Sequence, residues 1–315
     1  MCVCVVGFRF YRYCIPLAKP LRLHGEDVTT RAGILVHSEV TNGWGDASPL
    51  PGFSVETFDD VLKALPGSEL EFPPSLRFAI DSANNQPIIE TDRVVPVNAL
   101  LMGDWDSVLS QAEAAAQADY RSVKLKVGRQ SELISDIELV KTVDRILRPD
   151  QTLRLDANRA WRLEQAVEFA NAVRDLNIEY IEEPTEFSND LESFFAATEM
   201  PYALDETLLE QRDLLRYENA AALIVKPTLL GGVKMIRSLL NWGLPLTFSS
   251  CFESGVGILN VARWAADYAP HTPAGLDTYH WLQNDLLADS LDMSGGQLSL
   301  TATKVDLNRI EEVVL

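Results

Sequence analysis

The sequence predicts an α/β fold in which a β/α barrel of seven to eight strands carries a smaller α+β domain. From residue 94 onwards, short β-rich runs alternate with helical patterns. This alternation indicates βαβ units and a parallel sheet. The residues before 94 instead show strands followed by helices, which is typical of an α+β domain. With 315 residues, 47% of them hydrophobic, the chain has ample material for a core of this size.

The N-terminal segment, residues 1–93, is expected to form the smaller domain together with residues 292–315. Its expected elements are strands over Phe8–Pro16 and Gly33–Val40, turns at Asn42-Gly43 and Gly45-Asp46, a Pro- and Gly-rich loop over 48–53, and helices over Val55–Leu65 and Pro74–Ala83. The segment Leu298–Leu315 resembles a strand pair with polar turns. We therefore expect both ends of the chain to build one capping domain.

The barrel is expected over residues 94–291. Its strands are expected at Val94–Val97, Val123–Val127, Leu153–Asp156, Tyr180–Glu183, Tyr202–Asp205, Leu223–Lys226 and Pro245–Phe248, with an eighth near Ala274–Leu276. Helical patterns cover Ser107–Ala118, Ser131–Leu147, Leu163–Asp175 and Val256–Tyr268. Eight such strands indicate a TIM-type barrel. A doubly wound open sheet is the alternative, although no Gly-x-Gly-x-x-Gly follows a strand.

Charged side chains recur near the carboxyl ends of these strands, where buried parallel strands should carry none. They are Lys124, Lys126, Asp156, Glu182, Asp205 and Lys226. From Asp156 onwards they stand 26, 23 and 21 residues apart, each about one βα unit. The active sites of such barrels lie at this end, so the six side chains are expected to share one mouth. Taken singly, an Asp could cap a helix and a lysine could extend along the barrel surface. Six charged side chains at equivalent positions on five successive strands favour an active site.

The chemistry of this set is coherent. Three carboxylates without His or Cys suit a hard cation, most simply Mg²⁺, with Mn²⁺ as a substitute. Lysines beside a divalent cation and other cations are expected to have a lowered pKa, which lets a lysine act as a base. A cation next to a base is suited to removing a proton α to a carboxylate.

Composition excludes several partners. The chain has 27 Lys+Arg against 46 Asp+Glu, a formal net charge of −19. Such acidity argues against binding nucleic acid or an anionic membrane surface. The chain contains no run of 18 apolar residues, so the sequence predicts no membrane span. The four cysteines, Cys2, Cys4, Cys14 and Cys251, require no disulfide, and no signal peptide is evident, so a cytoplasmic protein is expected.

Several stretches resemble the enolase superfamily, in its muconate-cycloisomerase-like subgroup, whose sites use a lysine base with Mg²⁺. Within it they are most similar to the o-succinylbenzoate synthase family of menaquinone biosynthesis. The stretches are Val123–Gly128, Arg154–Trp161, Ile181–Pro184, Leu204–Thr207, Val225–Thr228, Ser249–Gly255, Gly275–Thr278 and, near the N-terminus, Ser48–Ser54.

This resemblance implies a hydro-lyase that converts 2-succinyl-6-hydroxy-2,4-cyclohexadiene-1-carboxylate to o-succinylbenzoate by syn dehydration. It implies that Lys126 acts first as base and then as acid, that Lys124 beside it lowers the pKa of Lys126 and meets the substrate carboxylate, and that Lys226 faces the other side of the ring as a cation–π partner. The implied Mg²⁺ ligands are Asp156, Glu182 and Asp205. The implied orienting residues are Asn158 and Glu206, and the implied substrate contacts are Arg154, Ser249, Ser250 and Gly275. The partner is a small carboxylate, and the protein is expected to be a monomer or homodimer.

Two other kinds of protein fit the same residues. An N-acylamino acid racemase or dipeptide epimerase would use Lys126 and Lys226 as bases on opposite faces. Dipeptide epimerases typically carry Asp-x-Asp at the eighth strand, whereas this chain reads Ala-Gly-Leu-Asp-Thr over 274–278. A muconate-type cycloisomerase is a weaker alternative. A non-catalytic metal-binding barrel is more remote, because a decayed site need not keep all six charged residues.

Overall fold

The computed structural model describes residues 7–23, 26–67, 71–85, 93–129, 132–210, 214–300 and 304–314. Its main sheet has seven parallel strands in the spatial order β11-β10-β9-β8-β7-β6-β5. They are β5 (Ala99–Leu101), β6 (Ser122–Lys126), β7 (Thr152–Asp156), β8 (Ile178–Glu182), β9 (Tyr202–Leu204), β10 (Ala220–Val225) and β11 (Leu246–Phe248). The predicted fold class, a modified TIM-type barrel with a capping domain, is confirmed.

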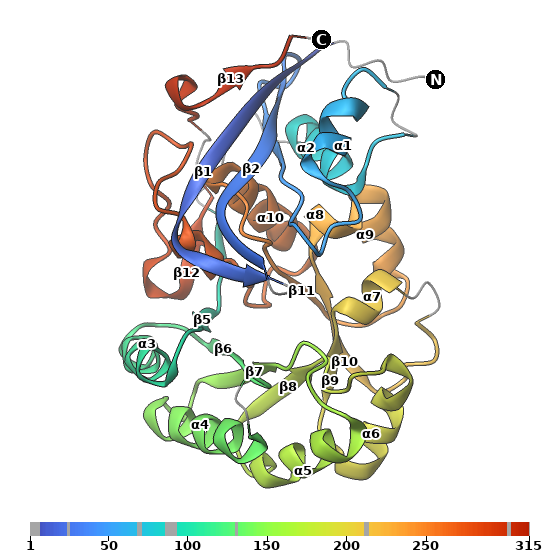
Figure 1. Ribbon diagram of the computed structural model, residues 1–315, viewed down its shortest axis with the longest axis vertical. Coiled ribbons are helices and arrows are strands. Elements are labelled where there is room, and N and C mark those ends of the chain that lie inside the picture. The colour runs from blue at the N-terminus through green and yellow to red at the C-terminus, as the bar shows by residue number, and fades with distance from the viewer. Residues whose placement is uncertain are drawn as a thin grey trace.

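Helices alternate with these strands and cover the outside of the sheet (Figure 1). They are α3 (Trp105–Gln117), α4 (Leu133–Ile146), α5 (Leu163–Val173), α6 (Leu191–Thr198), α7 (Glu206–Glu210), α8 (Pro227–Leu230), α9 (Val233–Leu240) and α10 (Gly255–Tyr268). Each long helix turns an apolar stripe inward, as Val108, Ala112 and Ala115 do on α3. One continuous core therefore joins the strands to the helix layer.

The expected eighth strand is reduced to a two-residue bridge. Ala274 pairs in parallel with Val97, and Gly275 pairs in parallel with Ser249 just after β11. The backbone N–H of Gly275 donates to the Phe248 carbonyl (2.8 Å), and that of Asn98 donates to the Ala274 carbonyl (3.0 Å). These bonds connect the two edges of the seven-stranded sheet.

The prediction that Val94–Val97 is the first barrel strand is wrong. The strand β4 (Val94–Pro96) instead pairs antiparallel with β12 (Gln297–Ser299), and the barrel sheet begins at β5. Pro96 has no N–H to donate, which favours an edge position over a central strand.

The capping sheet is antiparallel, in the order β13-β1-β2-β3. It comprises β1 (Phe8–Leu23), β2 (Glu26–Ser38), β3 (Trp44–Ala47) and β13 (Glu311–Glu312), with helices α1 (Phe58–Ala64) and α2 (Pro74–Asn84) packed on it. A separate small core with Phe10, Ile34 and Leu76 lies between sheet and helices. The Gly45-Asp46 turn is a further incorrect prediction, because both residues lie within β3. A Cβ on Gly45 would meet the Ala79 carbonyl of α2, so the residue serves close packing.

The two ends of the C-terminal segment go to different places. β12 pairs with β4 apart from the main sheet, whereas β13 pairs with β1 in the capping sheet. The domain limits 1–93, 94–291 and 292–315 stay a prediction. No helix among the described residues combines the length and apolar character needed to cross a membrane. Cys14 and Cys251 are free, and Cys2 and Cys4 lie outside the described residues.

Candidate active site

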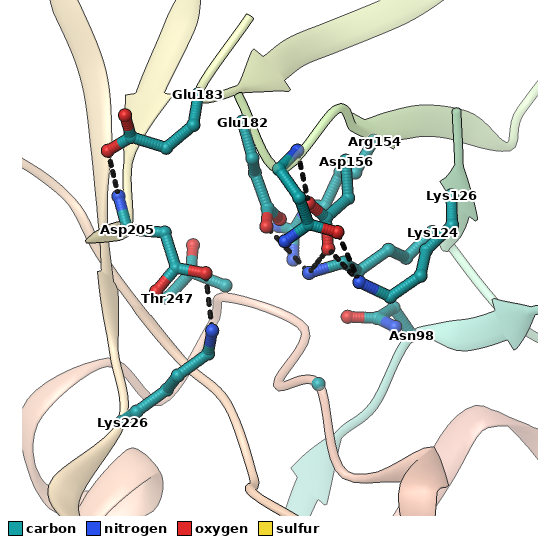
Figure 2. Close-up of polar contacts among 12 residues, drawn as sticks. Asn98, Lys124, Lys126, Arg154, Asp156, Glu182, Glu183, Asp205, Lys226 and Thr247 are labelled. Atoms are coloured by element: carbon teal, nitrogen blue, oxygen red, sulfur yellow. Dashed lines mark hydrogen bonds and ion pairs between the residues drawn. The ribbon is translucent and has the colours of Figure 1, made fainter. Parts of the chain in front are cut away.

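The register of three neighbouring strands places charged residues in one row. Lys126 on β6 pairs with Asp156 on β7, and Asp156 pairs with Glu182 on β8. Asp205 follows β9, and Lys226 follows β10. Parallel strands end at the same edge of their sheet, so the side chains that were predicted to share one mouth do converge there (Figure 2).

Lysine ammonium groups bridge the carboxylates of this row. The Lys124 Nζ lies 2.9 Å from Asp156 Oδ2 and 2.6 Å from Glu182 Oε2. The Lys126 Nζ lies 3.0 Å from the same Asp156 oxygen. On the opposite side of the barrel mouth, Lys226 pairs with Asp205. The two lysine groups thus flank a common space, as their strand positions predicted.

The three lysines differ in the direction of their pKa shift because their surroundings differ. Burial lowers the pKa of Lys126, and the cations Lys124 and Arg129 lower it further, against the pull of Asp156. Burial also opposes the charge on Lys124 and Lys226, but nearby carboxylates outweigh it and raise the pKa of each. The protein groups alone therefore lower the pKa of Lys126 and raise that of Lys124 and Lys226. Lys124 contacts both Asp156 and Glu182, and Lys226 contacts Asp205, whereas the only carboxylate that Lys126 contacts among the described residues is Asp156. The lowered pKa expected beside a bound divalent cation stays a prediction for Lys124 and Lys226.

The carboxylates fit a divalent cation by their chemistry. Asp156, Glu182 and Asp205 are each at most 2% exposed, and they offer oxygen ligands only. Burial and the neighbouring carboxylates raise the pKa of Glu182 to about 7, against the effect of Lys124, so added positive charge would stabilise its ionised form. Within the part of the chain that the structure describes, no three His, Cys, Asp or Glu side chains are already arranged to hold a metal. Each of the three carboxylates instead forms an ion pair with a lysine.

Asn158 lies between the predicted base and Glu206. The Lys126 Nζ donates to Asn158 Oδ1 (2.6 Å), and Asn158 Nδ2 donates to Glu206 Oε1 (3.1 Å). Asn158 has a φ of +44°, a left-handed conformation that Asn tolerates better than most residues. The other oxygen of Glu206, Oε2, is buried without a hydrogen-bond partner in the described structure. These contacts support orienting roles for Asn158 and Glu206.

Glu183 is an organising residue that the sequence did not reveal. It is fully buried and accepts bonds from the backbone N–H of Asp205 (2.9 Å) and of Thr207 (2.8 Å). The Arg159 Nε donates to its second oxygen (3.1 Å). Glu183 therefore fixes the backbone that carries Asp205 (Figure 2). The only signal in the sequence is its place beside Glu182, directly before Pro184.

A cavity of about 220 Å³ opens above the charged row. Its inner wall carries the three lysines, Asp156 and Asn158, together with the predicted residues Ser249, Ser250 and Gly275. Its outer wall is largely apolar and comes from both domains: Leu21, Leu23, Leu50 and Phe53 from the capping domain, and Leu100, Met102, Leu229 and Phe252 from the barrel. A reacting centre here lies between polar groups on one side and hydrocarbon on the other.

Arg154 does not reach this cavity, which corrects the expectation that it binds substrate. It is 1% exposed, and it forms an ion pair with Glu179 (Nε–Oε2, 2.7 Å) while also donating to the Pro273 carbonyl (2.6 Å). Its guanidinium also stacks over the Tyr180 ring, 5.3 Å from the centroid. Arg154 lies two residues before Asp156, so it shares the face but sits deeper in the barrel.

Comparison with known proteins identifies the family. Residues 107–304 match the model of the enolase C-terminal domain-like family, and residues 6–83 match that of the MenC N-terminal domain. The o-succinylbenzoate synthase of Haemophilus influenzae is 31% identical over 311 residues, covering 89% of this chain and 92% of its own. The chain belongs to the o-succinylbenzoate synthase family of the enolase superfamily.

Solved structures agree with this fold. A dipeptide epimerase from Enterococcus faecalis, complexed with Mg and the dipeptide L-Leu-L-Tyr, superposes with a TM-score of 0.78 at 20% identity over 97% of this chain and 99% of its own. MenC from Desulfotalea psychrophila superposes with a TM-score of 0.75 at 21% identity over 93% and 99%. Epimerases and this chain thus share one fold. The family assignment depends on the sequence relatives and the family models, not on the fold.

The structure adds cavity residues to this o-succinylbenzoate synthase family member that were not predicted as site residues. Asn98, Asp277, Thr278, Arg22 and Arg129 all line the cavity. Asp277 and Thr278 end a stretch that carried the resemblance, and Arg129 follows Gly128 in another, so position in a motif was the available signal. Asn98 and Arg22 lie outside the stretches that resemble the family, so the sequence did not point to them.

Proposed function

We propose that this chain catalyses the Mg²⁺-dependent syn dehydration of 2-succinyl-6-hydroxy-2,4-cyclohexadiene-1-carboxylate to o-succinylbenzoate. Membership of the o-succinylbenzoate synthase family makes it a hydro-lyase. The observation that carries the proposed chemistry is Lys126: a lysine of lowered pKa that lines the cavity beside three buried carboxylates.

Lys126 would act twice. Its Nζ removes the proton α to the ring carboxylate, and the ammonium formed returns that proton to the departing hydroxyl, which leaves as water. Both transfers occur on one face of the ring, so one lysine suffices for a syn elimination. Asn158 accepts a hydrogen bond from this Nζ and would hold it in place between the two transfers.

The remaining charged residues would stabilise the negative charge that develops. Lys124, with its raised pKa, stays protonated and would meet the ring carboxylate. Asp156, Glu182 and Asp205 would hold Mg²⁺, which when bound supplies the positive charge that makes the α proton more acidic. Lys226, paired with Asp205 across the mouth, would face the other side of the ring.

The shape and charge of the cavity suit such a dicarboxylate. Leu50, Phe53 and Phe252 supply an apolar wall that would exclude water from the ring. Arg22 and Arg129 also line the cavity, and they offer cationic groups for the succinyl carboxylate. We place this activity in the cytoplasm, where the free Cys14 and Cys251 would stay reduced.

The test is loss of the cyclohexadiene absorbance on adding the purified protein with Mg²⁺. Lys126→Ala is expected to abolish turnover, at least about 10³-fold in kcat, because it removes both proton transfers. Lys63→Ala, at an exposed lysine of the capping domain, is the control and is expected to match the unaltered protein. Turnover retained in Lys126→Ala would refute the assignment of the base. Racemisation of N-succinyl amino acids without dehydration would favour the racemase instead.

A further inference from the structure

Arg31 is a buried arginine at the junction of the two domains. It lies on β2 and is 1% exposed. Its Nη2 donates to the Ser48 carbonyl (2.7 Å), its Nη1 to the Pro49 carbonyl (2.9 Å) and its Nε to the Phe252 carbonyl (3.0 Å). One planar group thus binds three backbone oxygens. Two of them belong to the capping domain and one to the barrel.

These carbonyls belong to two loops that contribute to the apolar wall of the cavity. The capping loop, residues 48–54, contributes Leu50 and Phe53, and the barrel loop, residues 249–254, contributes Cys251 and Phe252. The four side chains pack in one apolar cluster. We call these two loops the loop wall. Arg31 connects the two halves of the loop wall from behind.

The barrel half of the loop wall is held in a strained conformation. Phe252 has a φ of +59°, which a bulky residue adopts only where its surroundings impose it. Its carbonyl is an Arg31 acceptor, and its neighbours are also tied, because Glu253 accepts from the Cys251 N–H (2.5 Å) and from the Thr228 hydroxyl (2.5 Å). Losing the Arg31 contact would release one restraint on this backbone.

Buried acids surround the same junction. Asp46 accepts bonds from the Tyr13 hydroxyl (2.7 Å), the Ser254 N–H (3.0 Å) and the Ser254 hydroxyl (2.7 Å). Burial raises the pKa of Asp46 to about 6 and raises that of Glu253 as well, and the Arg31 charge opposes the shift at Glu253. A neutral side chain at position 31 would remove this compensation. A lysine would keep the charge but could not reach three fixed acceptors with one nitrogen.

We propose that Arg31 is a positioning residue that sets substrate affinity by holding the two halves of the loop wall together. Arg31 does not line the cavity, whereas Lys126 does, so we expect the proton transfers themselves not to depend on Arg31. The substrate in this inference is that of the proposed function.

Arg31→Lys and Arg31→Met test the inference by steady-state kinetics, run well below the melting temperature of each variant. We expect KM to rise about tenfold or more and kcat to stay within about threefold, the pattern of lost uniform binding. Arg148→Lys is the matched control. Arg148 also binds two backbone carbonyls, those of Ala116 and Ala118, away from the cavity, so its loss should lower stability without changing KM.

A second measurement separates this inference from the proposed reaction. Hydrogen exchange without substrate should show faster exchange at the amides of Phe53, Ser54 and Cys251 in Arg31→Lys than in Arg148→Lys. If the unaltered protein does not dehydrate the substrate, the proposed function fails. The exchange pattern still tests whether Arg31 holds the two halves of the loop wall together. The inference is overturned by an unchanged KM or unchanged exchange in folded Arg31 variants, by an equal KM rise in Arg148→Lys, or by both Arg31 variants failing to fold.

Discussion

At the residue scale, neighbours decide what a lysine can do. Lys124 and Lys126 share a strand face and an Asp156 oxygen. Lys124 also binds Glu182, so its charged form is stabilised and its pKa rises. Burial and the nearby cations Lys124 and Arg129 lower the pKa of Lys126, whose Nζ binds the neutral Asn158 where that of Lys124 binds Glu182. Two identical side chains on one strand are thereby suited to different work, one as a fixed cation and one as a base.

Arg129 gives a prediction at the same scale. It lines the cavity and has no ion pair within the described residues, so its charge is available to a substrate carboxylate. Arg129→Ala should raise KM about three- to tenfold, since a charge-assisted hydrogen bond at an exposed site such as this one contributes about 1 kcal/mol. Arg129→Ala should weaken binding of the product but not of a product analogue whose succinyl carboxylate is replaced by methyl.

Arg162→Ala is the control for this measurement, because Arg162 is exposed and pairs only loosely with Glu186 (3.8 Å). Equal loss of affinity for product and analogue would show that Arg129 does not bind the second carboxylate.

At the element scale, the turn that follows β6 has to bend sharply beside the next strand end. Gly128 has a φ of +71°, and a Cβ there would lie 2.3 Å from the Ala160 Cβ. Glycine is therefore required twice, for its backbone conformation and for the close approach. This turn directly follows Lys126 and Val127, so its shape helps to set the direction in which β6 presents the base.

Gly128→Ala should lower the free energy of unfolding by about 3 kcal/mol or more, because the steric overlap adds to the backbone strain. Gly243 supplies a matched control, since it has the same φ of +71° but no atom within 4 Å of the point where a Cβ would lie. Gly243→Ala should cost only about 1 kcal/mol. Urea denaturation measures both. Equal losses would mean that crowding at Ala160 plays no part.

At the scale of the whole molecule, charge is distributed unevenly. The chain carries a net charge of −19, yet the cavity is lined by Arg22, Lys124, Lys126, Arg129 and Lys226. A divalent cation would offset most of the charge of the three buried carboxylates. The outer acidity promotes solubility and does not help to attract an anionic substrate over long distances.

Magnesium should therefore stabilise the folded chain. A ligand that binds only the folded state stabilises it by about 2.7 kcal/mol at one hundred times its Kd. A thermal melt should show a rise in Tm with MgCl₂ that NaCl of equal ionic strength does not reproduce. Glu182→Gln keeps the shape of the side chain and removes the charge, so its Tm should respond much less. An equal rise in both proteins would exclude Glu182 from the metal site.

Much of the fold and of the charged row could be predicted from the sequence. The βα period is a local property, and it located six of the seven barrel strands and the residues at their ends. The first strand was misplaced because Val94–Pro96 is as β-rich as a barrel strand, and only its pairing with Gln297–Ser299 distinguishes it. Local composition does not report which distant segment a strand will meet.

The sequence by itself determined which side chains stand at the carboxyl ends of the strands, because strand periodicity and βα spacing are local. Only the tertiary structure decided their partners. It placed Arg154 against Glu179 below the cavity, gave Lys124 and Lys226 carboxylate neighbours that raise their pKa, and brought Arg31 to carbonyls of both domains. The physical reason is that burial, electrostatic environment and hydrogen-bond partners depend on residues from other elements of the chain, 25 positions away for Arg154 and Glu179 and 221 for Arg31 and Phe252.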